Sequence, residues 1–185
     1  SDSKLISFMN WMPLWISCIY LFFTSNRPIS GLHPWKQAES LAQIDISAGL
    51  LDYPSVFHDY AGSLIFWDTP IYQSFVGFIS LFIPLDPLLI ARHLNVFLLL
   101  GIAYFSVQIF SSLFNSFNIF WFLFMLCANP FILHYFATPL PDLLAIFLGF
   151  LGLFLYWKPS KITISFPSTQ FFIILICFSL ATVIK

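Results

Sequence analysis

Long apolar runs separated by short polar breaks are the feature that most constrains what this chain can fold into. The runs lie at 5–23, 88–110, 117–137, 141–157 and 170–185. Each approaches the roughly 20 residues that cross the hydrocarbon core of a bilayer as a helix. The short breaks between the later runs carry Asn, Ser, Pro and Lys, which favour turns. The pattern predicts an all-α, polytopic transmembrane helical bundle with about five spans.

The composition fits lipid rather than water as the surrounding solvent. Of the 185 residues, 59% are hydrophobic and 8% are charged, whereas a soluble domain carries about 25% charged residues. The formal net charge of -1 leaves no basic surface for a nucleic acid. Cys18, Cys127 and Cys177 each lie inside an apolar run without a CxxC spacing, so we interpret them as small apolar residues.

The apolar run 71–85 permits two interpretations. At 1.5 Å per residue a helix of this length reaches only about 22 Å, short of the roughly 30 Å core. A re-entrant or interfacial helix is therefore at least as well supported as a span. If the run does not cross, Glu39 and Asp142 face the same side of the membrane; if it crosses, they face opposite sides. Lys and Arg are balanced between the two sides, so charge does not fix the orientation.

The polar segment 24–87 concentrates the titratable groups of the chain. It contains most of the eight acidic residues, together with His33 and His58. For any single acid in such a loop, simple solvation is the alternative to a functional role. Because the apolar runs are nearly free of charge, this segment is nevertheless the candidate site.

Within that segment, the stretch 36–51 has the apolar period of a helix lying along a membrane surface. The apolar stripe comprises Leu41, Ile44, Ala48 and Leu51, and the opposite face carries Lys36, Glu39 and Gln43. Glu39 is therefore expected at the interface beside Lys36. These two residues form either a surface salt bridge worth under about 1 kcal/mol or a site in which the carboxylate acts as a general base.

Several ordered blocks of sequence carry a resemblance to a known family. They are His33-Pro34-Trp35-Lys36-Gln37-Ala38-Glu39, Tyr53-Pro54, Asp68-Thr69-Pro70-Ile71-Tyr72, Ala91-Arg92, Asn129-Pro130 and Pro141-Asp142. In order and spacing, over roughly residues 5–157, they resemble membrane glycosyltransferases of the GT-C fold. The most similar group is the aminoarabinose-transferase and protein-mannosyltransferase-like one, whose first block is H-P-W-R-Q-A-D.

The resemblance implies a topology. The chain is expected to be the N-terminal part of a GT-C-like transmembrane domain within a longer protein. In this fold the segment matching 71–85 is a juxtamembrane helix on the outer face, so Glu39 and Asp142 would share a side. The resemblance further implies a bacterial inner (plasma) membrane location, with the site facing the periplasm or outside.

The resemblance also implies an inverting transfer of a sugar from a polyprenyl-phosphate donor to a lipid, glycan or protein acceptor. Glu39 matches the catalytic Asp and is the expected general base, and Asp68 and Asp142 match two further acids of the site. The groups expected to bind substrate and phosphate are Lys36, Arg92, His33 and Tyr72. No cofactor or metal is expected, although Glu39, Asp68 and Asp142 together offer the oxygen ligands of a divalent cation.

Two departures from the family pattern bear on this assignment. Glu stands at 39 where the family has Asp, which adds one methylene to the reach of the base. Lys stands at 36 where the family has Arg, which loses the bidentate fork for phosphate oxygens. Both substitutions keep the charge.

Two alternative functions remain open at this stage. A transporter or flippase would place ionisable groups within its spans, whereas here the spans are nearly bare and the acids gather outside them. A non-catalytic lipid-binding membrane protein would share the composition and lack turnover.

Overall fold

The structure is a computed structural model, and it describes the greater part of the chain. The described residues are 8–25, 34–49, 71–130, 133–134, 137–157 and 169–184, with side chains from Ala38 onward in the second range. All regular secondary structure in these ranges is helical, which confirms the all-α class. His33 and Asp68 lie outside the described residues.

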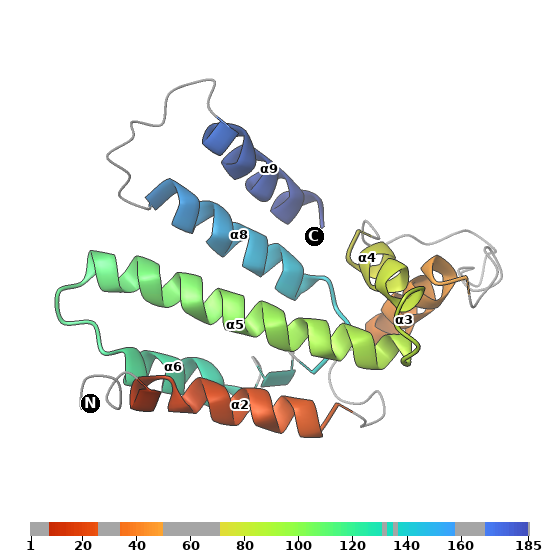
Figure 1. Cartoon of the computed structure of the whole chain (residues 1–185), viewed down its shortest axis with the longest axis horizontal. Coiled ribbons are helices and arrows are strands. Elements are labelled where there is room, and N and C mark those ends of the chain that lie inside the picture. The colour runs from red at the N-terminus through yellow and green to blue at the C-terminus, as the bar shows by residue number, and fades with distance from the viewer. Residues whose placement is uncertain are drawn as a thin grey trace.

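A central helix organises the bundle. Helix α5 (Pro87–Leu113) is flanked on one side by α8 (Asp142–Trp157), which α9 (Thr169–Val183) covers in turn. On its other side lie α2 (Met12–Phe23) and α6 (Ile119–Ala128) (Figure 1). Helix α5 contacts α2, α6 and α8 and therefore forms the centre of the bundle.

Local sequence signals determine where the central helices begin. Asp86 accepts a hydrogen bond from the backbone N–H of Leu88 at 2.7 Å, and Pro87 occupies the first turn, where its missing N–H costs nothing. Asn118 caps α6 in the same way by accepting from the N–H of Trp121 at 3.1 Å. Asp86 and Asn118 therefore each supply an acceptor to backbone donors that a helix start leaves unpaired.

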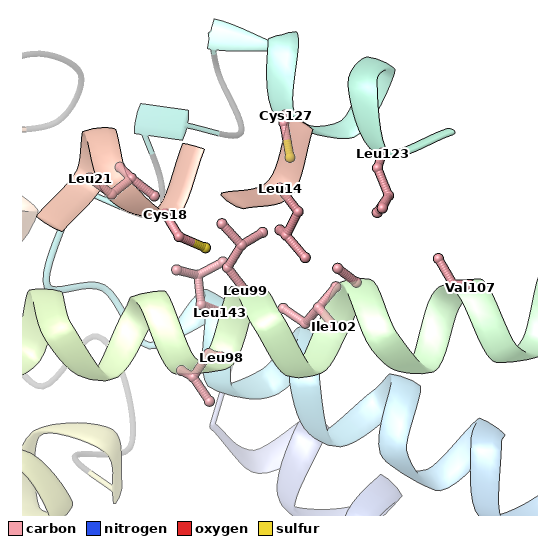
Figure 2. Packing of buried hydrophobic residues seen from close by; sticks show 11 residues of the cluster. Leu14, Cys18, Leu21, Leu98, Leu99, Ile102, Val107, Leu123, Cys127 and Leu143 are labelled. Carbon is pink, nitrogen blue, oxygen red and sulfur yellow. The ribbon is translucent and has the colours of Figure 1, made fainter. Parts of the chain in front are cut away.

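The apolar core lies between α5 and the α2–α6 pair. Its buried members are Leu14, Cys18, Leu21, Leu98, Leu99, Ile102, Ala103, Val107, Leu123, Cys127 and Leu143. Figure 2 shows side chains of α2 and α6 directed toward α5. The three cysteines are free and buried, as expected for small apolar residues.

The run 117–137 differs from the single helix that its hydropathy predicts. Helix α6 ends at Ala128, and Asn129 is extended, with φ -76 and ψ 114. The cause is Pro130, whose ring disfavours the helical conformation of the residue before it and which cannot donate a backbone hydrogen bond.

A pair of short helices lies beside the N-terminal end of α5. They are α3 (Pro34–Ser47) and α4 (Ile71–Ser80) (Figure 1). At Gly77 the two cross so closely that a Cβ would lie 2.5 Å from Cβ of Ser47 and 2.9 Å from the carbonyl oxygen of Ile44. With 10 residues, α4 is about 15 Å long and is too short to cross a hydrocarbon core of about 30 Å.

Among the described helices, α5 is long and apolar enough to cross a membrane. Its 27 residues correspond to about 40 Å. The helices α2, α6, α8 and α9 are also apolar and have 12, 10, 16 and 15 residues.

Candidate functional site

A non-helical segment leading into α8 is held by side chains from distant parts of the chain. Residues 137–140 form no regular helix, and Pro139 and Pro141 have no N–H. Their carbonyl groups are nevertheless satisfied: Arg92 Nε donates to Ala137 O at 3.0 Å and Asn95 Nδ2 donates to Thr138 O at 2.5 Å. The hydroxyl of Ser40 donates to Pro139 O. Three consecutive carbonyls, of which those of Thr138 and Pro139 belong to buried residues, thus obtain partners that secondary structure does not supply.

Two residues of α4 complete this network. The hydroxyl of Tyr72 donates to Oδ1 of Asn95 at 3.0 Å, and Nε2 of Gln73 donates to Oγ of Ser40 at 3.2 Å. Burial raises the pKa of the Tyr72 phenol, so this hydroxyl stays protonated and remains a donor. We refer to the side chains of Ser40, Tyr72, Gln73, Arg92 and Asn95, together with the carbonyls that they hold, as the polar clamp.

The polar clamp is buried. The exposed fractions of its side chains are 3% for Ser40, 0% for Tyr72, 2% for Gln73, 7% for Arg92 and 0% for Asn95. Burial makes each of these hydrogen bonds costly to lose, because a buried polar group without a partner costs about 1–3 kcal/mol. The clamp therefore determines how α3, α4, α5 and the start of α8 fit together.

Arg92 also connects the clamp to the end of α2. Its Nη1 donates to the carbonyl oxygen of Ser25 at 2.5 Å, just beyond the last turn of that helix. Next to Arg92 on α5, the ring of His93 stacks on Phe22, with ring centroids 4.8 Å apart. The carboxyl end of α2 is thus fixed to the amino end of α5 by a charge-assisted hydrogen bond and a stacked ring pair.

Two of the acids expected at the site lie beside the clamp. Glu39 precedes Ser40 on α3, and Asp142 is the first residue of α8, shortly after Pro139. Both are half-buried. A carboxylate in the first turn of a helix is favoured by the helix dipole. The hydrogen bond between Ser40 and Pro139 therefore brings the stretches that carry Glu39 and Asp142 together at one end of the bundle.

The remaining expected site residues have varied positions. Lys36 lies in the first turns of α3, in the part whose side chains are not described, and Asp68 and His33 lie outside the described residues. Arg92 and Tyr72 belong to the polar clamp. Their expected roles toward a phosphate or a substrate stay predictions.

One orientation expected on α3 is wrong. Gln43 was expected on the water-facing side with Glu39, but it is 5% exposed and buried, as are Ser40 and Ile44. The reason is the close approach of α4, which covers this face where Gly77 lacks a side chain. The helical period predicts which residues share a face, but not that a second helix covers the polar one.

A pair of acids near this end of the bundle repel one another. The pKa of Asp45 on α3 is raised by its partial burial and, to a smaller extent, by the negative charge of Asp86. Asp86 is occupied in capping α5. In the described part of the chain, no group of three or more His, Cys, Asp or Glu side chains is arranged to hold a metal ion.

Comparisons with protein-family models, with curated proteins and with solved structures each found no match to this chain.

Proposed function

We propose that this chain belongs to an integral membrane glycosyltransferase of the GT-C type. It transfers a sugar from a polyprenyl-phosphate donor to a lipid, glycan or protein acceptor at the outer face of a bacterial inner membrane. The proposal combines the ordered blocks of sequence described above with one structural observation. That observation is the hydrogen bond from Ser40 to Pro139, which joins the helix carrying Glu39 to the segment that leads into Asp142.

The position of the two acids supports a surface site. Glu39 and Asp142 both belong to the end of the bundle where α3 and α4 lie beside the start of α5 (Figure 1). Since α4 is too short to cross a bilayer, it adds no crossing that would place the two acids on opposite sides. A single site on one face of the membrane needs this arrangement.

The exposed surface of the bundle supports a lipid environment. Large apolar side chains on the outer faces of α2 and α9 are widely exposed: Trp15, Ile16, Ile19, Tyr20, Phe22, Phe23, Phe172, Ile173, Leu175 and Ile176. Contiguous apolar surface of this kind is rare on soluble monomers. Together with the length of α5, it favours several of these helices crossing or entering a membrane.

The chemistry that we propose needs few groups. The acceptor hydroxyl oxygen attacks the anomeric carbon as the bond from that carbon to the phosphate oxygen breaks, which inverts the anomeric centre. Glu39 takes the hydroxyl proton, and the polyprenyl phosphate leaves with the bonding electron pair. Cationic groups stabilise the departing phosphate, a role for which Lys36 is the candidate on the same helix as Glu39.

Replacing the proposed base gives the decisive experiment. In the full-length protein, Glu39→Gln should lower transfer by about 10²–10⁴-fold without loss of binding of the lipid donor. Glu39→Asp restores the carboxylate of the resembling family and should retain measurable turnover. Asp45→Asn lies on the same helix and serves as the control that should transfer normally.

The assay uses a panel of radiolabelled polyprenyl-phosphate sugars, including mannose and arabinose donors. Undiminished transfer by the Glu39→Gln variant would overturn the assignment of the base. Absence of transfer by the native protein from every donor, with lipid donor binding intact, would favour the non-catalytic lipid-binding alternative. Movement of the donor across the bilayer without transfer would favour a flippase.

A further inference from the structure

We propose that Ser40 is a positioning residue that fixes Glu39 relative to the start of α8. The proposal rests on the proposed function for its catalytic consequence, but its geometric part can be tested without any activity. It concerns a residue that the sequence pattern does not single out and that touches no proposed substrate.

The hydroxyl of Ser40 both donates and accepts a hydrogen bond. It donates its one proton to the carbonyl oxygen of Pro139, a residue 99 positions away in the chain. Its lone pairs then accept from Nε2 of Gln73 at 3.2 Å. Because the proton of Ser40 is committed to Pro139, Gln73 must present its NH₂ group rather than its oxygen. The hydrogen bonds therefore run in one direction, from Gln73 to Ser40 and from Ser40 to Pro139.

A second contact, near the carboxyl end of α3, also restricts the movement of this helix. At Gly77, α4 lies against Ser47 and Ile44 so closely that a Cβ has no room. Helix α3 is thus held near Ser47 by steric contact and near Ser40 by hydrogen bonds. Without the bond at Ser40, the contact near Ser47 and the packing of Ile44 remain, but the amino-terminal half of α3 loses its hydrogen bond to the segment before α8 and is expected to tilt more widely.

Glu39 is the residue most affected by such a movement, because it adjoins Ser40. A general base must lie within about 2.6–3.2 Å of the proton that it abstracts, and a misplacement of about 1 Å can cost about 10²-fold in rate. A Glu carboxylate already has one more rotatable bond than Asp, so the backbone that carries it needs the firmer anchor.

The geometric part is tested by pulsed electron resonance between spin labels on α3 and α8. The labels are placed through Ala38→Cys and Ile146→Cys, two exposed positions, in a background whose three buried cysteines are replaced by alanine. Ser40→Ala should broaden the distance distribution. Ser47→Ala is the matched control and should leave it narrow, since the hydroxyl of Ser47 donates to the carbonyl of Gln43 within the same helix at 2.9 Å.

The catalytic part is tested by kinetics on the full-length protein with the donor that supports transfer. Ser40→Ala should lower kcat by about 10–100-fold with the KM for the donor unchanged, whereas Ser47→Ala changes neither. Ser40→Cys carries a larger atom that donates only weakly, and it is used in the kinetic test alone because its thiol would react with a spin label. It should lower kcat by less than Ser40→Ala, which it replaces there if the latter does not fold.

The outcomes separate this proposal from the proposed function. A narrow distance distribution in Ser40→Ala, or an unchanged kcat in Ser40→Cys, overturns the positioning role, whatever Glu39→Gln does. A broadened distribution with unchanged kcat also overturns it. Full activity of Glu39→Gln overturns the assignment of Glu39 as the base, and the broadening by Ser40→Ala then still establishes Ser40 as the anchor of α3.

Discussion

The apolar bundle and the polar clamp are held together by different means. In the bundle, α2, α5 and α6 meet through Leu, Ile, Val, Ala and Cys side chains that carry no directional bonds. In the clamp, α3 and α5 donate hydrogen bonds to the carbonyls of residues 137–139, and α4 donates to side chains of α3 and α5. The first kind of contact tolerates changes of side chain with similar volume. The second requires particular donors at particular positions.

The difference matters in a lipid environment. Apolar contacts between helices gain little there, because lipid tails are as apolar as Leu, so close packing and interhelical hydrogen bonds take a larger part in association. In such an environment the polar clamp would set the relative position of α3, α4, α5 and the start of α8. The following predictions test this contrast, from the largest expected effect to the smallest.

Removing the central amide of the clamp should have the largest effect on stability. Asn95→Leu removes the amide donor to Thr138 O and the acceptor at 3.0 Å from the hydroxyl of Tyr72, which keeps only the longer bond of 3.4 Å to Ala91 O. A buried polar group that loses its partner costs about 1–3 kcal/mol. Thermal unfolding in detergent measures the loss. Asn115→Leu, at an exposed position, should stay within about 0.5 kcal/mol of the native protein. Equal stability of the two variants would show that the clamp contributes no more than a surface site.

Adding one methyl group at a helix crossing should cost more stability beside the polar clamp than in the apolar bundle. At Gly77 the new Cβ meets backbone of α3, which cannot move aside, whereas at Gly101 it meets the ring of Phe147 at 2.3 Å, and a ring can rotate. Gly77→Ala should therefore destabilise by about 1–3 kcal/mol, and Gly101→Ala by less. The measurement is the shift of each variant's unfolding midpoint from that of the native protein. A larger loss at Gly101 would contradict the view that the bundle is the more tolerant region.

A third glycine provides the matched control for these crossings. A Cβ at Gly149 on α8 would meet nothing within 4 Å, so Gly149→Ala should stabilise by about 0.5–1 kcal/mol through the better helix propensity of Ala. Unfolding of this variant in the same detergent checks the sign. A loss of stability would mean that the face of α8 at Gly149 is covered in the folded protein.

The smallest effect is expected from the acids near the clamp. Because burial and Asp86 raise the pKa of Asp45 above 3.8, the folded chain binds that proton more tightly than the unfolded chain. The resulting destabilisation is absent below pH 3.8 and is fully present above the raised pKa. Asp45→Asn should therefore stabilise at pH 7 by under about 0.5 kcal/mol, since Asp45 is largely solvated.

Measuring the unfolding midpoint as a function of pH distinguishes an electrostatic cause of this stabilisation from a change in helix propensity. The advantage of Asp45→Asn should vanish as the pH falls below the ordinary pKa of an Asp. Asp86→Asn keeps an oxygen for the cap on Leu88 but removes the neighbouring charge, so it should lower the pKa of Asp45. An advantage of Asp45→Asn that does not depend on pH would contradict the electrostatic explanation.

Helix positions with local signals were predictable from the sequence. The apolar run 88–110 corresponds to α5, and the Pro-Leu-Asp-Pro break before it supplies the observed cap at Asp86. The run 141–157 likewise corresponds to α8. In both cases Pro and Asp act on the residues next to them, so no knowledge of distant contacts is needed.

The polar clamp was not predicted, because its bonds join residues far apart in the chain. Its members nevertheless left signals. Asn95 is a polar residue in the middle of an apolar run, and residues 137–141 contain two prolines whose neighbouring carbonyls need donors. The interruption at Asn129 had a signal too, in the proline that follows it. These signals indicate that partners exist, but not which side chains they are.

The bond between Ser40 and Pro139 has a consequence for how the protein is made. Its two ends are 99 residues apart, so at ordinary rates of synthesis the ribosome needs about 5–20 s to produce Pro139 after Ser40. During that interval α3 has a donor without its acceptor. The final docking of this helix waits until the segment before α8 has left the ribosome.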